Sequence, residues 1–306
     1  MKNYRQSQIK KNLHLRARVI QAVRSFFIER QYLEVDTPIR IPAPAPEAHI
    51  DAVASDNWYL QTSPELGMKQ LLAAGYSRIF QICKCFRHQE RGRKHLPELT
   101  MLEWYAAGGN YADLMDDCQE LIGLVAHQTT GSTDLSYQGQ SIDLSPPWPR
   151  LSVDEAFRRY AGVAPEEALA RNCFEEVVVN EIEPNLGTTG PIFLYDYPAT
   201  LGALARLKPE NPLVAERFEL YIAGIELCNG FSELTDPIEQ RKRFESEQKI
   251  RQSLNKPVYP MPQNFLAALN DMPPACGNAL GIDRLVMLFA DTADIDDVVA
   301  FTPEDL

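Results

Sequence analysis

The sequence lacks three features that would each indicate a particular class of protein. No apolar run in the 306 residues approaches the roughly 20 that a membrane-spanning helix needs, so no membrane partner is expected. The six cysteines form no C-x-x-C pair and no Cys/His cluster with the spacing of a zinc site. The amino-terminal residues also lack the apolar stretch of a secretory signal. We therefore expect a cytoplasmic protein with reduced thiols.

An excess of positive charge is missing as well. The chain has 30 Lys and Arg against 42 Asp and Glu, a net charge of -12, which opposes any general attraction to a polyanion. A polyanionic ligand must therefore meet a local group of cations. The hydrophobic share of 45% and charged share of 24% are ordinary for a globular protein, and the length allows a large core.

Hydrophobic periodicity predicts a mixture of helices and strands. Helices are expected at 15–30 and 111–128, a buried strand at 77–86, and hairpins at 136–144 and 216–234. A further helix is expected after Leu60, with Ser63 as its N-cap and Pro64 at its first position. Ser152 and Glu155 have the spacing of a capping box. Residues 130–205 have the weakest pattern, and we interpret them as an inserted helical segment.

Two predicted strands carry carboxylates among aromatic side chains. The segment "FRHQERGRKHLPELTMLEWY" (86–105) concentrates cations and ends in a strand, on which Glu103 and Tyr105 share a face. Near the end of the 216–234 hairpin, Asn229, Phe231 and Glu233 share a face by the same rule. Two such faces are suited to binding a cation between apolar walls.

Each of these features has a simpler explanation when it is taken alone. A run of charges usually faces water, and a single strand carboxylate such as Glu103 or Glu233 usually lies on the surface. Glu219 and Glu226 could rim a hairpin, and His95 alone could be an exposed loop histidine. The segment 273–290 is interpreted as a glycine-containing loop that leads into a helix. Only their joint occurrence in this order favours a binding site.

In this order the segments resemble the catalytic domain of class II aminoacyl-tRNA synthetases of the lysyl type. The long helix with "EVDTP" is similar to motif 1, residues 86–105 to motif 2, and "GNALGIDRLVML" to motif 3. "VAERFELYIAGIELCNGFSEL" resembles the lysine-site segment, and only about 130–205 lies outside clear similarity. The resemblance implies an α+β fold with an antiparallel sheet flanked by helices, a single catalytic domain over 1–306, and a homodimer formed through motif 1 and Pro38.

One difference from the lysyl enzymes points to a subfamily. Lysyl-tRNA synthetases carry an amino-terminal anticodon-binding barrel, for which the dozen or so residues before the first helix leave no room. The chain is therefore more similar to the elongation factor P lysine ligases, which attach β-lysine to a lysine of that translation factor. This resemblance implies ATP and Mg²⁺ as cofactors, lysine or β-lysine as substrate, elongation factor P as acceptor, and no tRNA.

The same resemblance assigns roles to individual residues. Arg87 would hold the α-phosphate and the substrate carboxylate, and His95 with Arg284 the outer phosphates, so Arg87 and Arg284 are the predicted catalytic residues. Glu219 and Glu226 would share magnesium, and Glu65 would receive the substrate amino group. The predicted ATP-binding residues are Arg87, His88, Gln89, His95, Leu96, Leu99, Glu219, Leu220, Gly281 and Arg284. The predicted amino-acid-binding residues are Ser63, Pro64, Glu65, Glu103, Tyr105, Glu226, Asn229, Phe231, Glu233 and Ala279.

The chain departs from the family pattern at a few of these positions. Gln89 and Leu96 replace a Glu and an Asn, and Leu99 replaces a Phe that stacks on adenine, which predicts weaker ATP binding by about 0.5 to 1.5 kcal/mol. Ala279 stands where lysyl-tRNA synthetases have Gly and the ligases have Ala. Because one methyl group is felt in a packed pocket, this position predicts a preference for β-lysine over α-lysine.

Two other functions are compatible with the same residues. The protein could be a truncated lysyl-tRNA synthetase that acts on tRNA, or a non-catalytic regulatory paralogue that binds lysine. The altered adenine residues support the second of these. The retained Arg87, Glu219, Glu226 and Arg284 favour catalysis, because a lysine-binding module needs no phosphate clamp.

Overall fold

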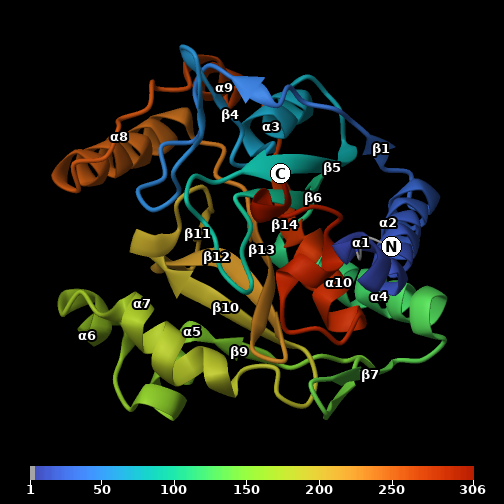
Figure 1. Cartoon of the computed structure of the whole chain (residues 1–306). Helices are drawn as coiled ribbons and strands as arrows, with labels where there is room; N and C mark the ends of the chain where they lie inside the picture. Colours follow the sequence, from blue (N-terminus) through green and yellow to red (C-terminus); the bar gives the residue numbers. More distant parts are fainter. Residues whose placement is uncertain (1–3) are drawn as a thin grey trace.

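A nine-stranded sheet runs through the computed structural model, which describes residues 4–306 (Figure 1). Two neighbouring pairs at its edges, β1 with β5 and β9 with β10, are parallel, and the other neighbours are antiparallel. The strands, in spatial order, are β1 (Leu33–Glu34), β5 (Arg78–Phe86), β6 (Glu98–Ala107), β14 (Ala275–Gly281), β13 (Ile225–Ser232), β12 (Asn211–Ile222), β10 (Ile192–Pro198) and β9 (Arg150–Ser152), with β11 (Leu207–Lys208) paired to β12. Helices flank this sheet, as expected for the predicted α+β class.

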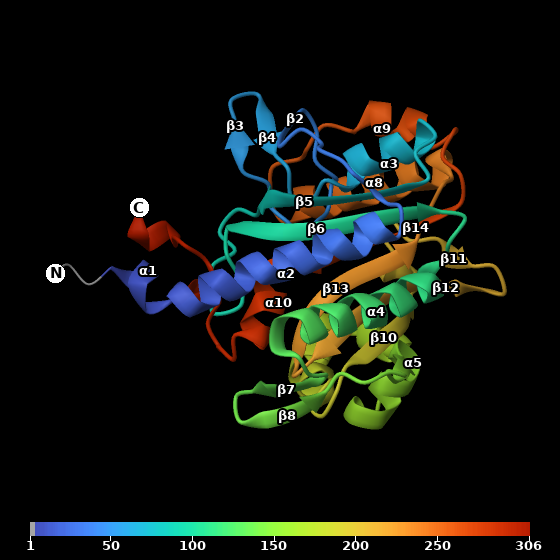
Figure 2. The ribbon, with the colours of Figure 1, turned by 90° about the vertical axis from the view of Figure 1, so that its right-hand side faces the viewer.

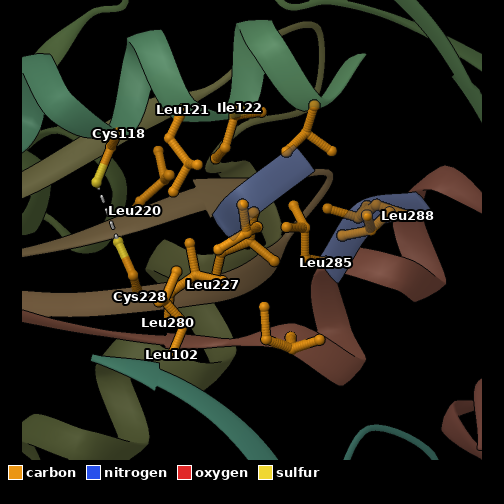
Figure 3. Close-up of a cluster of buried hydrophobic side chains, with 14 of the residues drawn as sticks. Leu102, Cys118, Leu121, Ile122, Leu220, Leu227, Cys228, Leu280, Leu285 and Leu288 are labelled. Carbon is orange, nitrogen blue, oxygen red and sulfur yellow. Dashed lines mark hydrogen bonds between the residues drawn. The ribbon is translucent and has the colours of Figure 1, made fainter. Parts of the chain in front are cut away.

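Three helices cover one face of the sheet and form the main core with it. They are α2 (Lys10–Glu29), preceded by the short α1 (Arg5–Gln8), α4 (Tyr111–Thr130) and α10 (Ile282–Phe289). Figure 2 shows α2 and α4 side by side across the sheet. Figure 3 shows leucines of the strands, among them Leu102, Leu220 and Leu280, packed against those of α4 and α10. The predicted helices at 15–30 and 111–128 are confirmed.

Three further helices and a small sheet lie above the central sheet in Figure 1. They are α3 (Glu65–Ala73), α8 (Pro237–Ser253), α9 (Gln263–Ala268) and the strands β2 (Arg40–Ile41), β3 (Ala54–Ser55) and β4 (Trp58–Leu60). A second apolar cluster joins α3, α8 and α9 to the sheet through Ile79 and Tyr105. This arrangement places the start of α3 against β6.

The weakly patterned segment 130–205 contains both helices and strands. A hairpin of β7 (Asp134–Tyr137) and β8 (Gln140–Asp143) turns at Gln138 and Gly139, whose φ values of 49° and 77° fit a type I′ turn. Helical turns follow between 153 and 185: α5 (Val153–Ala156), α6 (Pro165–Ala170), α7 (Phe174–Val177), π-helical turns at Phe157–Ala161 and Val178–Ile182, and a 3₁₀ turn at Glu183–Asn185. The predicted capping box at Ser152 is present. The flanking strands β9 and β10 belong to the central sheet, so the segment is continuous with it.

Two local predictions from the sequence were wrong. Residues 275–281, expected in a loop, form β14 between β6 and β13. Alternate positions of β14 are Ala or Gly, which have low strand propensity, so only pairing on both sides reveals it as a strand. Helix α3 begins at Glu65, one residue later than expected, with Pro64 rather than Ser63 as N-cap. The Ser63 hydroxyl still accepts a hydrogen bond from Glu65 N at 3.0 Å.

Within residues 4–306, no helix has both the length and the apolarity to cross a membrane.

Candidate active site

A cleft of about 770 Å³ lies on the sheet face that points away from α2 and α4. It is bounded by the loop between β5 and β6, by the β12–β13 hairpin, and by the start of α10. The cleft brings together most of the predicted nucleotide-binding residues with part of the amino-acid set: Arg87, Gln89, His95, Leu96, Leu99, Glu219, Glu226, Asn229, Ala279, Gly281 and Arg284. The sheet therefore unites segments that are far apart in the sequence.

Cations converge at one end of this cleft. Arg284 Nη2 lies 2.7 Å from His95 Nε2, and its Nη1 donates to the backbone O of Glu226 at 2.8 Å and to its carboxylate at 3.2 Å. Burial and the neighbouring Arg284 lower the pKa of His95, so the neutral imidazole accepts from the guanidinium. Arg87 lies 3.6 Å from Glu90. The guanidinium groups of Arg284 and Arg87 can neutralise a bound polyphosphate.

The loop that carries these residues is held by the end of the chain. Arg91 contacts Asp296 at 2.7 Å and Glu304 at 3.0 Å, and Ile295 N donates to Arg93 O at 2.9 Å. Gly92 and His95 form a β-bridge within the loop. These contacts fix the loop conformation, because its backbone and one of its arginines are both engaged.

Glu219 lies in a dense group of hydrogen-bond donors beside the cleft. Its carboxylate accepts from Tyr197 Oη at 2.6 Å, Tyr221 Oη at 2.8 Å and Arg217 Nη2 at 2.7 Å. Burial and the negative charge of Glu226 raise the pKa of Glu219. Arg217 also lines the cleft and was not predicted, although its position two residues before Glu219 places both on one strand face.

The two carboxylates of Glu219 and Glu226 are better suited to a magnesium ion, which takes few protein ligands, than to a metal that is coordinated by protein groups alone. No group of three or more His, Cys, Asp or Glu side chains in residues 4–306 is arranged to hold a metal. Magnesium usually keeps waters and phosphate oxygens and takes one or two carboxylates. Glu226 lines the cleft with one contact to Arg284, whereas Glu219 is already hydrogen-bonded. Glu226 is therefore the more available ligand of the two.

Three carboxylates and one lysine, here called the acid group, lie beyond the cleft on the same sheet face: Glu65, Glu103, Glu233 and Lys69. Lys69 Nζ bonds Glu65 Oε1 at 2.6 Å and also contacts Glu233 directly. The Lys69 side chain is 1% exposed, and its ammonium lies 5.0 Å from the centre of the Phe231 ring. An internal ammonium thus bridges two of the predicted lysine-binding carboxylates.

Glu103 is held by hydroxyl groups instead of by the lysine. Ser63 Oγ donates to its Oε1 at 2.6 Å, and Tyr105 Oη donates to its Oε2 at 2.8 Å. Ser63 and Tyr105, two residues of the predicted substrate-binding set, therefore orient this carboxylate. Pro64 follows Ser63 as the N-cap of α3.

The charges of the acid group respond strongly to burial. Burial and the nearby Glu65 raise the pKa of Glu103 to about 7. Burial raises the pKa of Glu233 to about 8 although Lys69 acts in the opposite direction. Burial tends to lower the pKa of Lys69, but the carboxylates of Glu233 and Glu65 outweigh it, so the pKa is raised. Lys69 therefore stays charged at neutral pH. Its four-residue spacing from Glu65 is the feature of the sequence that could have predicted this ion pair.

The small residues of β14 form the floor between the two carboxylate-bearing strands. Ala279 lies in register with Glu103 on one side and Asn229 on the other, and Gly277 with Tyr105 and Phe231. A Cβ atom at Gly277 would overlap the Tyr105 ring and the Glu233 carboxylate. Only glycine fits there, whereas the Ala279 methyl group lines the cleft.

Two predicted ATP-binding residues do not line the cleft. Leu220 is fully buried in the main core (Figure 3), because alternate residues of β12 point to opposite faces and Glu219 points to the cleft. Any contact between Leu220 and a nucleotide would have to use its backbone. His88 is exposed on the loop, and its backbone N donates to Asp51 O at 2.6 Å.

Comparison with known proteins matches this sequence to one family and to several of its members. The family described as "tRNA synthetases class II (D, K and N)" matches residues 1–305. The lysine–tRNA ligase of Moorella thermoacetica is 39% identical over 96% of this chain and 65% of its own length. The elongation factor P–(R)-β-lysine ligase of Pectobacterium carotovorum is 41% identical over 96% of this chain and 95% of its own length. That of Haemophilus influenzae is 40% identical over 95% and 94%. The chain thus spans just under two thirds of the first of these relatives.

Proposed function

This chain belongs to the class II tRNA synthetases of the aspartyl, lysyl and asparaginyl group, and from that premise we propose that it activates lysine or β-lysine with ATP. The product would be an aminoacyl adenylate, whose lysyl group is passed to a lysine side chain of elongation factor P in the cytoplasm. The relatives described above are all named ligases, in agreement with the predicted enzyme class.

The observation that carries this proposal is the charge of the acid group. When ionised, Glu65, Glu103 and Glu233 supply three negative charges against the single positive charge of Lys69, which leaves two uncompensated. A diamino acid such as lysine or β-lysine brings two ammonium groups, so the charges match. Its carboxylate would then lie toward Arg87 in the cleft. A monoamino acid would leave one buried carboxylate without a partner, at a cost of several kcal/mol.

The first step needs positive charge and positioning but no general base. The substrate carboxylate attacks the α-phosphorus in line, and pyrophosphate leaves. Arg87 neutralises the charge that develops on the α-phosphoryl oxygens, while Arg284 and His95 hold the outer phosphates. Magnesium bound at Glu226 and Glu219 would supply further positive charge to the phosphates.

The acceptor of the lysyl group is proposed from those relatives that this chain matches over nearly their whole length. The ligases of Pectobacterium carotovorum, Erwinia tasmaniensis and Hamiltonella defensa, named for elongation factor P, align over 94% to 98% of their lengths. The second candidate acceptor is lysine tRNA, which the Moorella relative favours. The net charge of -12 argues against it, because it gives no general attraction to a polyanion.

One experiment separates the candidates. Radiolabelled pyrophosphate exchange is measured with α-lysine and (R)-β-lysine offered separately, followed by transfer to elongation factor P or to lysine tRNA. We expect exchange with lysine isomers and transfer to the protein. Robust charging of tRNA would support the synthetase function, and no exchange with either isomer at millimolar ATP would support the regulatory one.

We also propose a homodimer formed through the motif 1 region. Large apolar side chains are exposed near Pro38, including Leu33 (50%), Ile39 (46%) and Trp58 (44%). An isologous contact would cover such residues in both copies. Light scattering at micromolar concentration should give the mass of a dimer, and a monomer would contradict the proposal.

A further inference from the structure

Unlike the first step, the transfer step of the proposed function requires a group that accepts a proton. The acceptor lysine arrives with its ε-amine protonated, because the pKa of a free lysine is about 10.4. An ammonium has no lone pair, so a proton must leave before nitrogen can attack the adenylate. A carboxylate at the cleft that no other residue already neutralises would meet this demand.

Glu47 has the required location. It lines the main cleft together with Arg87 and Arg217, and it also lines a second cavity of about 370 Å³ beside α8. Its side chain is partly buried, and within residues 4–306 no group donates a hydrogen bond to its carboxylate. A nucleophile could therefore reach Glu47 from the second cavity while ATP and the amino acid fill the cleft.

The loop that carries Glu47 is rigidly anchored. The fully buried Arg251 of α8 donates from Nη1 to the backbone O of Glu47 at 2.7 Å and of Ile50 at 3.0 Å. Ala48 N donates to Glu247 Oε2 at 2.7 Å. Figure 1 shows this blue loop running next to α8. Because the backbone on both sides is fixed, the Glu47 carboxylate is held at the boundary of the two cavities. Its own oxygens take no part in holding the loop.

We propose that Glu47 binds the ε-ammonium of the acceptor lysine and takes its proton during transfer. The nitrogen lone pair forms the new bond to the carbonyl carbon of the adenylate. The bond from that carbon to the phosphate oxygen breaks, and AMP leaves with the electron pair. One proton passes from the ammonium to the Glu47 carboxylate before the attack, the second N–H proton leaves on the phosphate of the departing AMP, and an amide remains. This role rests on the proposed function and extends it to the second step.

The charges around Glu47 suit this task. Burial and the carboxylate of Glu65 raise the pKa of Glu47 to about 7, and Glu247 acts in the same direction. Arg87 and Arg217 act in the opposite direction. A general base works best when its pKa lies near the working pH, since it is then both deprotonated and basic enough.

The test compares two nucleophiles in the Glu47→Gln variant. Pyrophosphate exchange measures the activation step. Transfer to elongation factor P needs a proton acceptor, because the attacking lysine is protonated. Hydroxylamine is a small nucleophile that is already neutral at pH 7.5, so its attack does not need one. We expect the ratio of transfer to exchange to fall by about 100-fold, the lower end of typical general-base contributions. The ratio of hydroxamate formation to exchange should match the wild type. Glu175→Gln removes another carboxylate from the same cleft and should change neither ratio.

Three results would overturn the role of Glu47. An unchanged ratio of transfer to exchange would show that another group takes the proton. An equal loss with hydroxylamine would indicate a structural effect. A change in exchange that depends on the lysine isomer would assign Glu47 to the donor amino group. Absence of exchange in the wild type would instead overturn the proposed function, and this inference with it.

Discussion

The two faces of the central strands β6, β14 and β13 have opposite characters. Facing α2, α4 and α10, the side chains of Leu102, Trp104 and Leu280 are 0% exposed and pack in the main core. On the opposite face the neighbouring positions are charged, aromatic or small, and include Glu103 of the acid group and Ala279 of the cleft. Residues that are adjacent in sequence therefore belong to different environments.

This contrast separates the residues that stabilise the protein from those that would do its chemistry. Burying apolar side chains on the core face favours folding. Burying Glu103 and Glu233 opposes it, since an ionised carboxylate loses its hydration. Lys69 and the hydroxyls of Ser63 and Tyr105 offset only part of that loss, as the raised pKa values of both carboxylates indicate. We therefore expect substitutions on the core face to lower stability with little effect on activity. Substitutions in the acid group should lower activity without lowering stability.

The largest effect is expected from neutralising the acid group. Glu103→Gln and Glu233→Gln should each lower kcat/KM for lysine in pyrophosphate exchange. The expected loss corresponds to about 3 to 5 kcal/mol of transition-state stabilisation, because a substrate ammonium loses its buried partner. The KM for ATP should change little, and the free energy of unfolding should stay the same or rise. Glu98→Gln, on the exposed part of β6, is the matched control. Near-normal kinetics in both variants would show that the ammonium binds elsewhere.

The neighbouring core residue should behave in the opposite way. Leu102→Ala leaves a cavity beneath α4 and α10 and should lower the free energy of unfolding by about 2 to 5 kcal/mol. Urea denaturation measures this change. The KM for lysine, measured well below the unfolding temperature, should stay close to that of the wild type. A large rise in this KM would mean that the two faces are mechanically coupled.

A smaller effect is expected at the floor of the cleft. Ala279→Gly removes one methyl group in register with Glu103 and Asn229. If this methyl group disfavours α-lysine, the preference for β-lysine should fall by about 1 to 3 kcal/mol, mainly through improved use of α-lysine. The measurement is kcat/KM for both isomers in both proteins. An unchanged ratio, or a wild type that prefers α-lysine, would remove Ala279 as the determinant.

The smallest effect concerns pH. Since the pKa of Glu103 is about 7 and that of Glu233 about 8, both are partly protonated near neutral pH, and binding of an ammonium should release protons. The KM for lysine should therefore rise as pH falls from 8 to 6, and Glu103→Gln should reduce this dependence. Both folded-state pKa values lie above the unfolded value of about 4.3. Their contribution to stability is therefore complete at low pH and is lost as pH rises through 7 to 8. Thermal unfolding followed across this range tests the sign.

Much of the fold could be predicted because its signals are local. The amphipathic helices, the β12–β13 hairpin and the capping box at Ser152 each depend on residues within a few positions of one another. The predicted family is confirmed by the family match over residues 1–305, and the predicted fold class by the sheet with its flanking helices. Strand alternation also predicted that Glu103 and Tyr105 share one face of β6.

The sequence by itself thus determined the long helices, the hairpins, the family and the types of residue that gather at the site. Only the tertiary structure decided which of them meet. It placed β14 between two carboxylate-bearing strands, turned Leu220 into the core, and inserted Lys69 between Glu65 and Glu233. The physical reason is that periodicity along one segment reports which side of it is buried, whereas the partner of a buried charge comes from a segment far away in the sequence.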